Sequence, residues 1–383
     1  MRFIHTADWH LGRSFHNAPL IEDQAYVLNQ LIDLAEDAKP DLLIIAGDIY
    51  DRAIPPTDAI ELLDDTLFRL IRDIKITVLL IAGNHDSPQR LQFGARLLER
   101  LKLHVFGTLP ERSNFIQMYD EAGPVCFYAM PYAEPSVIRE HLKDDQITNY
   151  DTGIRAWTNL VRGIHAPIAR SVIVTHAFVS GGEACDSERP LSVGSAGTVD
   201  VGCFEGFHYV ALGHLHRPQS LANEQIQYSG SLLKYSFSEA SHSKSVNLVD
   251  MDAVGQCKVE RIPLTAKRDV RCIDGSMAEI LSGKVDAGDR NDFVRVRLSD
   301  KGAILDATGK LREVYPNVME IERPTFMAEL RTSQSSRVDY TKSDRASLFA
   351  AFYLEVTGEV LTDEQAAIFS SVVDKMRQDE RGV

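Results

Sequence analysis

The sequence predicts an α/β domain, followed by a small α+β module and by helices near the C-terminal end. Short apolar runs alternate with helical patterns through the first 110 residues, and this β-α-β-α-β order favours a sheet that is at least partly parallel. After about residue 264 an alternating strand pattern replaces the continuous apolar runs. The 383 residues are long enough for about two to three domains.

In the N-terminal part, residues 2–6 are predicted to form a strand, and apolar runs predict buried strands at residues 42–46 and 77–82. Helices are expected between and after them, the third over residues 90–101. Apolar spacings of three and four residues define the buried faces of the first two helices, which comprise Ile21, Ala25, Leu28, Ile32 and Ala35, and then Ile60, Leu63, Leu67 and Ile71. Further strands are predicted at 125–130, 171–175, 209–212 and 246–250, and the polar stretch 180–202 is expected to be a functional or disordered loop.

The C-terminal part contains a predicted strand at 293–298, in which Arg295 and Arg297 alternate with aliphatic residues. A helix at 304–314 and a strand at 318–321 complete the expected module. Residues 332–336 (TSQSS) are expected to form a linker, with helices at 346–356 and 363–377 beyond it. The predicted domains are therefore 1–265, 266–331 and 332–383.

The composition excludes several classes of protein. The chain has 41 Lys and Arg residues against 55 Asp and Glu residues, and its net charge of −14 argues against binding nucleic acid or anionic lipid through overall charge. A local basic groove stays possible. The five cysteines include no CxxC pair, which favours a reducing cytoplasm over a disulfide framework. No apolar run approaches the ~18–20 residues that cross a bilayer, and the N-terminus lacks the features of a signal peptide.

Five short polar motifs follow predicted strands. They are Asp8-Trp9-His10, Gly47-Asp48, Gly83-Asn84-His85-Asp86, Thr175-His176 and Gly213-His214-Leu215-His216. Ligands of open α/β sheets bind at the carboxyl ends of strands, so the five motifs point to one site. A single histidine at a strand end is more often a structural residue, but five of the twelve histidines fall in these motifs. Together they predict a functional site.

The motifs supply seven candidate metal ligands, namely Asp8, His10, Asp48, Asn84, His176, His214 and His216. Seven ligands are too many for one tetrahedral zinc ion and suit two octahedral ions. Asp48 is the expected bridge between ions about 3.5–4 Å apart, a spacing typical of two-metal phosphoryl transfer. His85 follows Asn84 on the same turn, and we expect it to face the substrate, where it protonates the leaving oxygen or stabilises developing charge.

The order DxH, GD, GNHD, H and GHLH is the signature of the calcineurin-like metallophosphoesterases. Within that superfamily, the chain resembles the SbcD family, the nuclease subunits of bacterial SbcCD complexes, through MRFIHTADWHLG, AGDIYDR, AGNHDS, ALGHLHRPQ, YSGSLLKYSFSE and DSERPLSVGSAGTVD. The resemblance covers residues 1–265 strongly and the remainder in layout. It implies a β-sandwich flanked by helices for 1–265, a DNA-capping domain for 266–331, and a linker with docking helices for 332–383.

The resemblance also implies roles for individual residues. Asp8, His10, Asp48 and His216 would hold one ion, and Asp48, Asn84, His176 and His214 the other. The implied cofactors are two Mn²⁺ ions, with Fe²⁺ or Zn²⁺ as alternatives. His85 would donate the proton, with Asp86 as its supporting partner. Asp51 stands where many relatives carry a second catalytic histidine, which makes it a further candidate catalytic residue.

The substrate that the resemblance implies is DNA, chiefly double-strand ends, hairpins and ends blocked by protein. Candidate phosphate contacts follow the metal motifs, and they are Arg13, His16, Arg52, Arg90 and Arg217. The alternative for each is a solvated or ion-paired surface residue, and the same two alternatives hold for Arg295 and Arg297. Tyr235 and Phe237 either stack a base or belong to the core.

The implied partner is the SbcC ATPase, bound to a homodimer of the nuclease subunit in a heterotetramer. An apolar and aromatic stripe near the chain end suits helix-in-groove docking to that partner, the alternative being packing against the same chain. Its residues are Leu348, Phe349, Phe352, Tyr353 and Val356.

Two other functions use the same motifs. A two-metal phosphodiesterase acting on a smaller nucleotide substrate would need the metal core, but residues 266–383 lie outside such a core. A structural scaffold that binds DNA ends through an inactive metal site would not need all seven ligands together with His85.

Overall fold

The computed structural model describes residues 1–109, 115–166, 169–189, 191, 197–222, 224–285, 288–301, 304–323, 349–350, 352–354, 357 and 360–381. The chain divides into two compact units, Met1–Val270 and Arg271–Val383. The predicted linker at 332–336 and the first three residues of the predicted helix at 346–356 lie outside the described residues.

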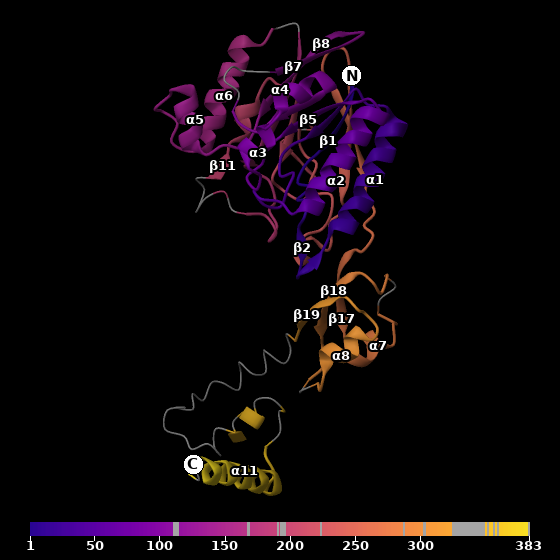
Figure 1. Ribbon diagram of the computed structural model, residues 1–383, viewed down its shortest axis with the longest axis vertical. Coiled ribbons are helices and arrows are strands. Elements are labelled where there is room, and N and C mark those ends of the chain that lie inside the picture. Colours follow the sequence, from indigo (N-terminus) through magenta and orange to yellow (C-terminus); the bar gives the residue numbers. More distant parts are fainter. Residues whose placement is uncertain are drawn as a thin grey trace. The chain divides into compact units, whose positions relative to one another are not determined.

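The first unit contains two six-stranded sheets that pack face to face (Figure 1). The first sheet has the order β16 (Cys257–Pro263), β15 (Ser245–Met251), β1 (Arg2–Thr6), β4 (Leu42–Ile45), β5 (Thr77–Ile81) and β6 (Leu103–Phe106). The second has the order β13 (Gln219–Leu221), β14 (Ile226–Tyr228), β12 (Tyr209–Gly213), β9 (Arg170–His176), β8 (Gly123–Met130) and β7 (Phe115–Asp120). Side chains from both sheets, including Phe3, Leu79, Phe127 and Val172, form one core between them.

Both sheets are mixed, and the strands that precede the polar motifs run parallel. In the first sheet, β1, β4 and β5 are parallel neighbours. In the second sheet, β8, β9 and β12 are parallel neighbours. The antiparallel strands lie toward the edges, as β15 and β16 do. Parallel strands end at the same edge of a sheet, so this register gathers the motifs. The predicted α/β fold class is confirmed.

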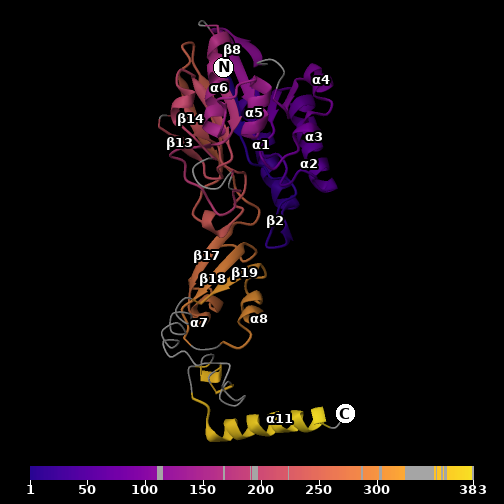
Figure 2. The ribbon, with the colours of Figure 1, turned by 90° about the vertical axis from the view of Figure 1, so that its left-hand side faces the viewer.

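Helices cover the outer faces of the sandwich. Figures 1 and 2 show α1 (Ile21–Ala38) beside α2 (Thr57–Phe68), which continues into a π-helical turn, Arg69–Asp73. On the second sheet, α5 (Pro135–Leu142) and α6 (Tyr150–Ile164) bury Ile138 and Trp157 in a separate core. Two short pairs, β2 (Ser14–Phe15) with β3 (Ala18–Pro19) and β10 (Phe178–Val179) with β11 (Thr198–Val199), lie in the connecting loops.

The predicted buried faces of α1 and α2 are wrong in part. In α2 the buried residues are Ala59, Leu63 and Thr66, whereas Ile60 is exposed. In α1 the side chains of Gln24 and Val27 are buried, and Ala25 is only half-buried. Gln24 can be buried because its side-chain amide donates hydrogen bonds to the backbone carbonyls of Trp9 and His10. The spacing of apolar residues alone does not predict the burial of such side chains.

The prediction of one continuous helix at 90–101 is also wrong, because the segment is divided into shorter helices. It is replaced by α3 (Pro88–Gln92), α4 (Ala95–Leu98) and a short 3₁₀ turn, Glu99–Leu101. Gly94 has a φ of +76°, a left-handed conformation that ends α3. Phe93 and Leu97 are then 86% and 77% exposed, so this segment presents apolar side chains to solvent instead of burying them.

The second unit contains a three-stranded sheet of β17 (Val270–Gly275), β18 (Phe293–Leu298) and β19 (Val318–Glu322), with α7 (Met277–Leu281) and α8 (Ala307–Arg312) packed on it. The strand predicted at 293–298 is confirmed. Arg295 and Arg297 form ion pairs with Glu320 and Glu322 across the sheet. The helix predicted at 363–377 is α11 (Asp363–Arg381), and the ring of Phe349 stacks on Phe369 of α11.

None of the described helices is long and apolar enough to cross a membrane. All five cysteines are free thiols.

One ion pair joins three strands of the second sheet. The side chain of Arg170, in β9, is only 5% exposed. Its Nη1 lies 3.0 Å from Oδ2 of Asp120, at the end of β7. It also donates to the carbonyl of Gly123, where β8 begins. The hydrogen bonds from Arg170 hold the pKa of Asp120 well below its ordinary value.

Replacing Asp120 with Asn should lower the free energy of unfolding by about 1–3 kcal/mol near neutral pH, because the buried Arg170 charge loses its partner. A carboxyl whose folded pKa is depressed stabilises the protein above its unfolded pKa of about 4 and ceases to do so as the pH falls further. Urea unfolding of wild type and variant should therefore converge under acidic conditions. Asp250→Asn, at the exposed pair with Arg2, is the control and should cost less than about 1 kcal/mol; equal losses in the two variants would contradict this assignment.

Candidate metal centre

The motifs that follow β1, β4, β5, β9 and β12 converge on one buried cluster where the two sheets meet. Six of the seven predicted metal ligands are at most 4% exposed, and these are Asp8, His10, Asp48, His176, His214 and His216. The seventh, Asn84, is half-buried. Three overlapping groups of His and Asp side chains in this cluster have the spacing of a metal site.

The backbone at the cluster is strained. Asp8, His10, Asp48 and His214 have φ values of 54°, 47°, 50° and 110°. Residues other than glycine seldom adopt positive φ, and such residues gather at functional sites where the surrounding structure holds them. The strain therefore coincides with four of the seven ligands and turns their side chains toward a common centre.

Glycines permit close approaches at the cluster, both between the two sheets and between neighbouring loops of the first sheet. A Cβ on Gly213, at the end of β12, would lie 1.9 Å from the carbonyl oxygen of Ala46, just after β4. A Cβ on Gly83 would lie 2.2 Å from Oδ1 of Asp48. Hydrogen bonds then cross the gap: His176 Nδ1 donates to the Ala46 carbonyl at 2.9 Å, and the His214 N–H donates to the Asp8 carboxylate at 3.0 Å.

His10 and His216 form the first half of the cluster, with their Nε2 atoms 3.0 Å apart. Ser187 Oγ donates its only hydrogen to Glu239, so at 2.7 Å it must accept one from His216 Nδ1. The Nε2 lone pair of His216 therefore points at His10. The other ring nitrogen of His10 is buried without a hydrogen-bond partner among the described residues. A cation that binds both Nε2 atoms would account for this contact.

Asn84, His176 and His214 form the second half. Because His176 Nδ1 donates to Ala46, its Nε2 carries a lone pair, and this atom lies 3.0 Å from the side-chain oxygen of Asn84. His214 Nδ1 is 3.1 Å from the same oxygen. Asp48 Oδ2 lies between the halves, 3.6 Å from His10 Nε2 and 3.5 Å from His176 Nε2. So many convergent acceptors fit a dimetal site with a shared carboxylate.

Burial shifts the titration of the whole cluster. It raises the pKa of Asp48 to about 6 and, together with the Asp48 charge, raises the pKa of Asp8 well above its ordinary value. Burial also lowers the pKa of His176 and of His216 to about 4. Without counter-ions the site therefore resists both carboxylate ionisation and histidine protonation.

The structure fixes the orientation of His85, and the hydrogen bonds of Asp86 within the described residues are made with groups other than the His85 ring. His85 Nδ1 donates to the backbone carbonyl of Asp51 at 2.8 Å, and its Nε2 lies 3.9 Å from Asp48 Oδ2, facing the cluster. The Asp86 carboxylate instead accepts hydrogen bonds from the backbone N–H groups of Ile49, Tyr50 and Gly83. It ties together the loops that follow β4 and β5. The side chain of Asp51 lies 3.6 Å from His10 Nδ1.

The candidate DNA contacts occupy different environments. His16, Arg52 and Arg90 are exposed. Arg13 is largely buried: it lies 3.3 Å from Asp51 Oδ1, donates to the Ser187 carbonyl and stacks over the Tyr235 ring. Arg217 is paired with Glu183. Tyr235 and Phe237 are buried, which favours the core alternative for both.

The structure adds supporting residues that sequence reasoning missed. Ser187 and Glu239 hold the outer nitrogen of His216, and Lys244 Nζ bridges Glu239 and the His216 carbonyl. Burial opposes ionisation of Glu239, yet the positive charge of Lys244 holds the pKa of this carboxyl well below the ordinary value. The stretches DSERPLSVGSAGTVD and YSGSLLKYSFSE carry Ser187 and Glu239, but no spacing rule connects residues so far apart in the chain.

Comparison with known proteins agrees with this site. Residues 1–218 match the calcineurin-like phosphoesterase family. The chain therefore belongs to the calcineurin-like phosphoesterases and is a hydrolase with the residues of a dimetal site. Residues 266–357 match the C-terminal domain family of SbcD, described as type 5 capsule protein repressor C-terminal domain. Together, the two matches identify an SbcD-type member of the superfamily.

Solved structures of low sequence identity are also similar to this chain. A dimetal phosphatase from Danio rerio is 13% identical, with 70% of this chain and 99% of that chain covered and a TM-score of 0.39. A protein of Thermus thermophilus is 12% identical, with 68% and 98% covered and a TM-score of 0.37.

Metal binding at this centre should weaken as the pH falls through about 6, because protons then compete for Asp48 and Asp8, while the histidines stay neutral until about pH 4. Calorimetric titration of metal-free protein with Mn²⁺ should give an affinity about tenfold or more lower near pH 5.5 than near pH 7.5. An affinity that is constant over this range, or that falls only near the lowered histidine pKa values, would contradict this picture.

Proposed function

We propose that this chain is a manganese-dependent DNA nuclease, with exonuclease activity on double-strand ends and endonuclease activity on single strands and hairpins. The observation that carries the proposal is the combination of the buried dimetal cluster with the SbcD C-terminal match at residues 266–357. A phosphodiesterase for small nucleotides needs the first of these features and not the second.

The donor set supports manganese as the metal. The convergent atoms are imidazole nitrogens together with carboxylate and amide oxygens, and no cysteine belongs to the described clusters. Such a set suits Mn²⁺, with Fe²⁺ or Zn²⁺ as alternatives. Asp8, His10, Asp48 and His216 would hold one ion, and Asp48, Asn84, His176 and His214 the other.

Two bound ions would draw phosphate oxygens into the site and supply a hydroxide nucleophile for in-line attack on phosphorus. The residues of the chain orient the substrate and handle the proton. His85 Nε2 faces the cluster while its Nδ1 is anchored on the Asp51 carbonyl, so a protonated His85 can pass its proton to the departing sugar oxygen. Asp86 keeps the two loops in register.

The three parts of the chain would divide the work. We assign residues 1–265 to cleavage, 266–331 to capping the DNA, and 332–383 to the linker and docking helices. The exposed His16, Arg52 and Arg90 are the better candidates for phosphate contacts, because Arg13 is occupied inside the protein. The ion pairs of Arg295 and Arg297 leave less of their charge for phosphate.

The helices near the C-terminal end would bind the SbcC ATPase. Phe349 stacks on Phe369 of α11, and Gln365 donates to the Tyr353 hydroxyl, which makes a helical pair. Phe352, Ile368 and Val372 are more than half exposed on this pair. An apolar surface of this kind suits helix-in-groove recognition. Leu348 and Val356, also predicted for this stripe, lie outside the described residues.

The segment that follows β5 would form the homodimer interface. Phe93, Leu97 and Leu101 are spaced four residues apart and are all more than 60% exposed, and Phe68 at the end of α2 is 59% exposed. Figure 2 shows α2, α3 and α4 on the same side of the unit. Clustered exposed apolar residues of this size mark protein interfaces, and a second copy of the chain would present the same face.

Cleavage of a labelled hairpin duplex tests the nuclease proposal. With Mn²⁺, alone or with the ATPase partner, the protein should cut the hairpin, and EDTA should abolish cutting. His85→Ala should lower the rate by about 10²–10⁴-fold through loss of the general acid, while Mn²⁺ binding measured by calorimetry persists. His141→Ala, in α5, is the matched control. An undiminished rate in His85→Ala removes the role of His85, and fast hydrolysis of small phosphodiesters without DNA cleavage supports the smaller-substrate alternative.

Replacing both Phe93 and Leu97 with Asp should convert a dimer into a monomer, because two charges would be buried in the apolar interface. Light scattering after size exclusion measures the mass directly. Leu305→Asp alters an equally exposed apolar residue in the second unit and should leave the mass unchanged. A wild-type monomer, or a dimer that survives the double substitution, would show that this face has another purpose.

A further inference from the structure

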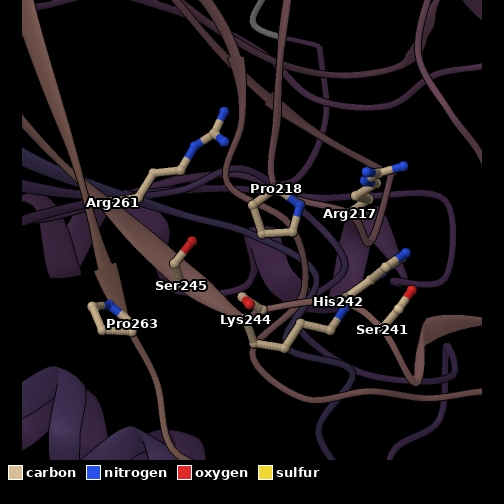
Figure 3. Close-up of a pocket in the computed structure, with 9 residues that line it drawn as sticks. Arg217, Pro218, Ser241, His242, Lys244, Ser245, Arg261 and Pro263 are labelled. Carbon is tan, nitrogen blue, oxygen red and sulfur yellow. The ribbon is translucent and has the colours of Figure 1, made fainter.

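A polar pocket lies beside the edge strand β16 and its neighbour β15 in the first sheet, outside the metal ligands (Figure 3). Its volume is about 410 Å³, and it is lined by Arg217, Pro218, residues 241–245, Arg261 and Pro263. Pockets that bind small ligands have volumes of roughly 300–1,000 Å³. Arg217 and Pro218 directly follow His216, so the pocket adjoins the last metal motif.

Two polar atoms in this pocket have no hydrogen-bond partner among the described residues. They are the hydroxyl of Ser245, a residue only 5% exposed, and the buried Nδ1 of His242. Buried polar atoms are almost always hydrogen-bonded in folded proteins. Two exceptions in one pocket therefore mark a place that a polar ligand would complete. Ser241 and Ser243 add exposed hydroxyl groups to the same wall.

The pocket is basic, and one of its cations is available. Lys244 and Arg217 are each paired with a carboxylate, from Glu239 and Glu183 respectively. Arg261 differs, because within the described part of the chain its guanidinium forms no ion pair and one hydrogen bond, to Gln227 Oε1 at 3.5 Å. Figure 3 shows Arg261 and Arg217 on either side of Pro218. An anion that enters the pocket would meet an unpaired guanidinium and unsatisfied hydrogen-bonding atoms together.

We propose that this pocket binds a phosphate group of a nucleotide. A guanidinium pairs with phosphate through two parallel N–H donors, and hydroxyl and imidazole groups complete such a site. The volume leaves room for the sugar beside the phosphate. Lys244 lines the pocket and also donates to the His216 carbonyl at 2.7 Å, so the bound group would lie next to the metal centre. The phosphate site stands on its own geometry, whereas the choice of a nucleotide as its bearer rests on the proposed nuclease function.

Calorimetry on the full-length protein in EDTA tests the proposal, since the metal centre then lacks ions to hold phosphate. The probes are inorganic phosphate, thymidine monophosphate, and a short oligothymidylate without terminal phosphates, with thymidine as the uncharged control. Arg261→Gln should weaken binding of a phosphate probe about tenfold or more, the loss expected for a charge-assisted contact, and Ser245→Ala should weaken it several-fold. Arg155→Gln removes an equal charge from the exposed face of α6 and should change nothing.

The probes distinguish the two sources of the phosphate. Binding of phosphate and thymidine monophosphate that depends on Arg261 identifies a free nucleotide, whereas Arg261-dependent binding of the oligonucleotide alone identifies a DNA strand. Absence of binding by wild type, or equal binding by wild type, Arg261→Gln and Arg155→Gln, overturns the proposal. Manganese-supported hydrolysis of bis(p-nitrophenyl) phosphate should be unchanged in Arg261→Gln. Loss of hairpin cleavage would therefore leave the phosphate site standing, and absence of phosphate binding would leave the nuclease proposal standing.

Discussion

The contact between the carboxyl ends of the two sheets is the constraint on which the metal centre depends. The Ala46 carbonyl, just after β4, accepts a hydrogen bond from His176 Nδ1 and lies so near Gly213 that no Cβ would fit there. This contact sets the tautomer of His176 and turns its Nε2 toward Asn84. It also places the acidic ligands of the first sheet against the histidines of the second. Larger residues at this contact would separate the sheets and disperse the ligands.

The close contact buries several acceptor atoms together, an arrangement that bound cations would stabilise. Acceptor atoms face one another in a buried space, and four ligand residues hold positive φ values. Ligands of this kind are stabilised when cations bind them. Two divalent ions would add about +4 to the local charge and reverse the sign of the field at the site. The net charge of −14 therefore describes the chain as a whole and not the surface that a phosphate would meet.

The sequence predicts the parts of this protein that local patterns control. Apolar runs locate most of the strands around the site, and the short motifs after the strands contain all seven residues that the structure brings together. The misplaced face of α2 comes from Ala59 and Thr66, since small residues can be buried where the larger Ile60 is not. Gly94 interrupts the predicted helix at 90–101 because it adopts a positive φ. The helical spacing of the apolar residues around it gives no sign of this interruption. The contacts of Ser187, Glu239 and Asp86 depend on how distant loops meet, which periodicity does not encode.

Anomalous diffraction at the manganese absorption edge, from crystals grown with Mn²⁺, is the most direct test of the two-metal centre. Two peaks per chain are expected, about 3.5–4 Å apart. One should lie beside His10 and His216 and the other beside Asn84 and His176, with the Asp48 carboxylate in contact with both. A single peak, or two peaks that do not share Asp48, would contradict the arrangement derived from the convergence of the two sheets.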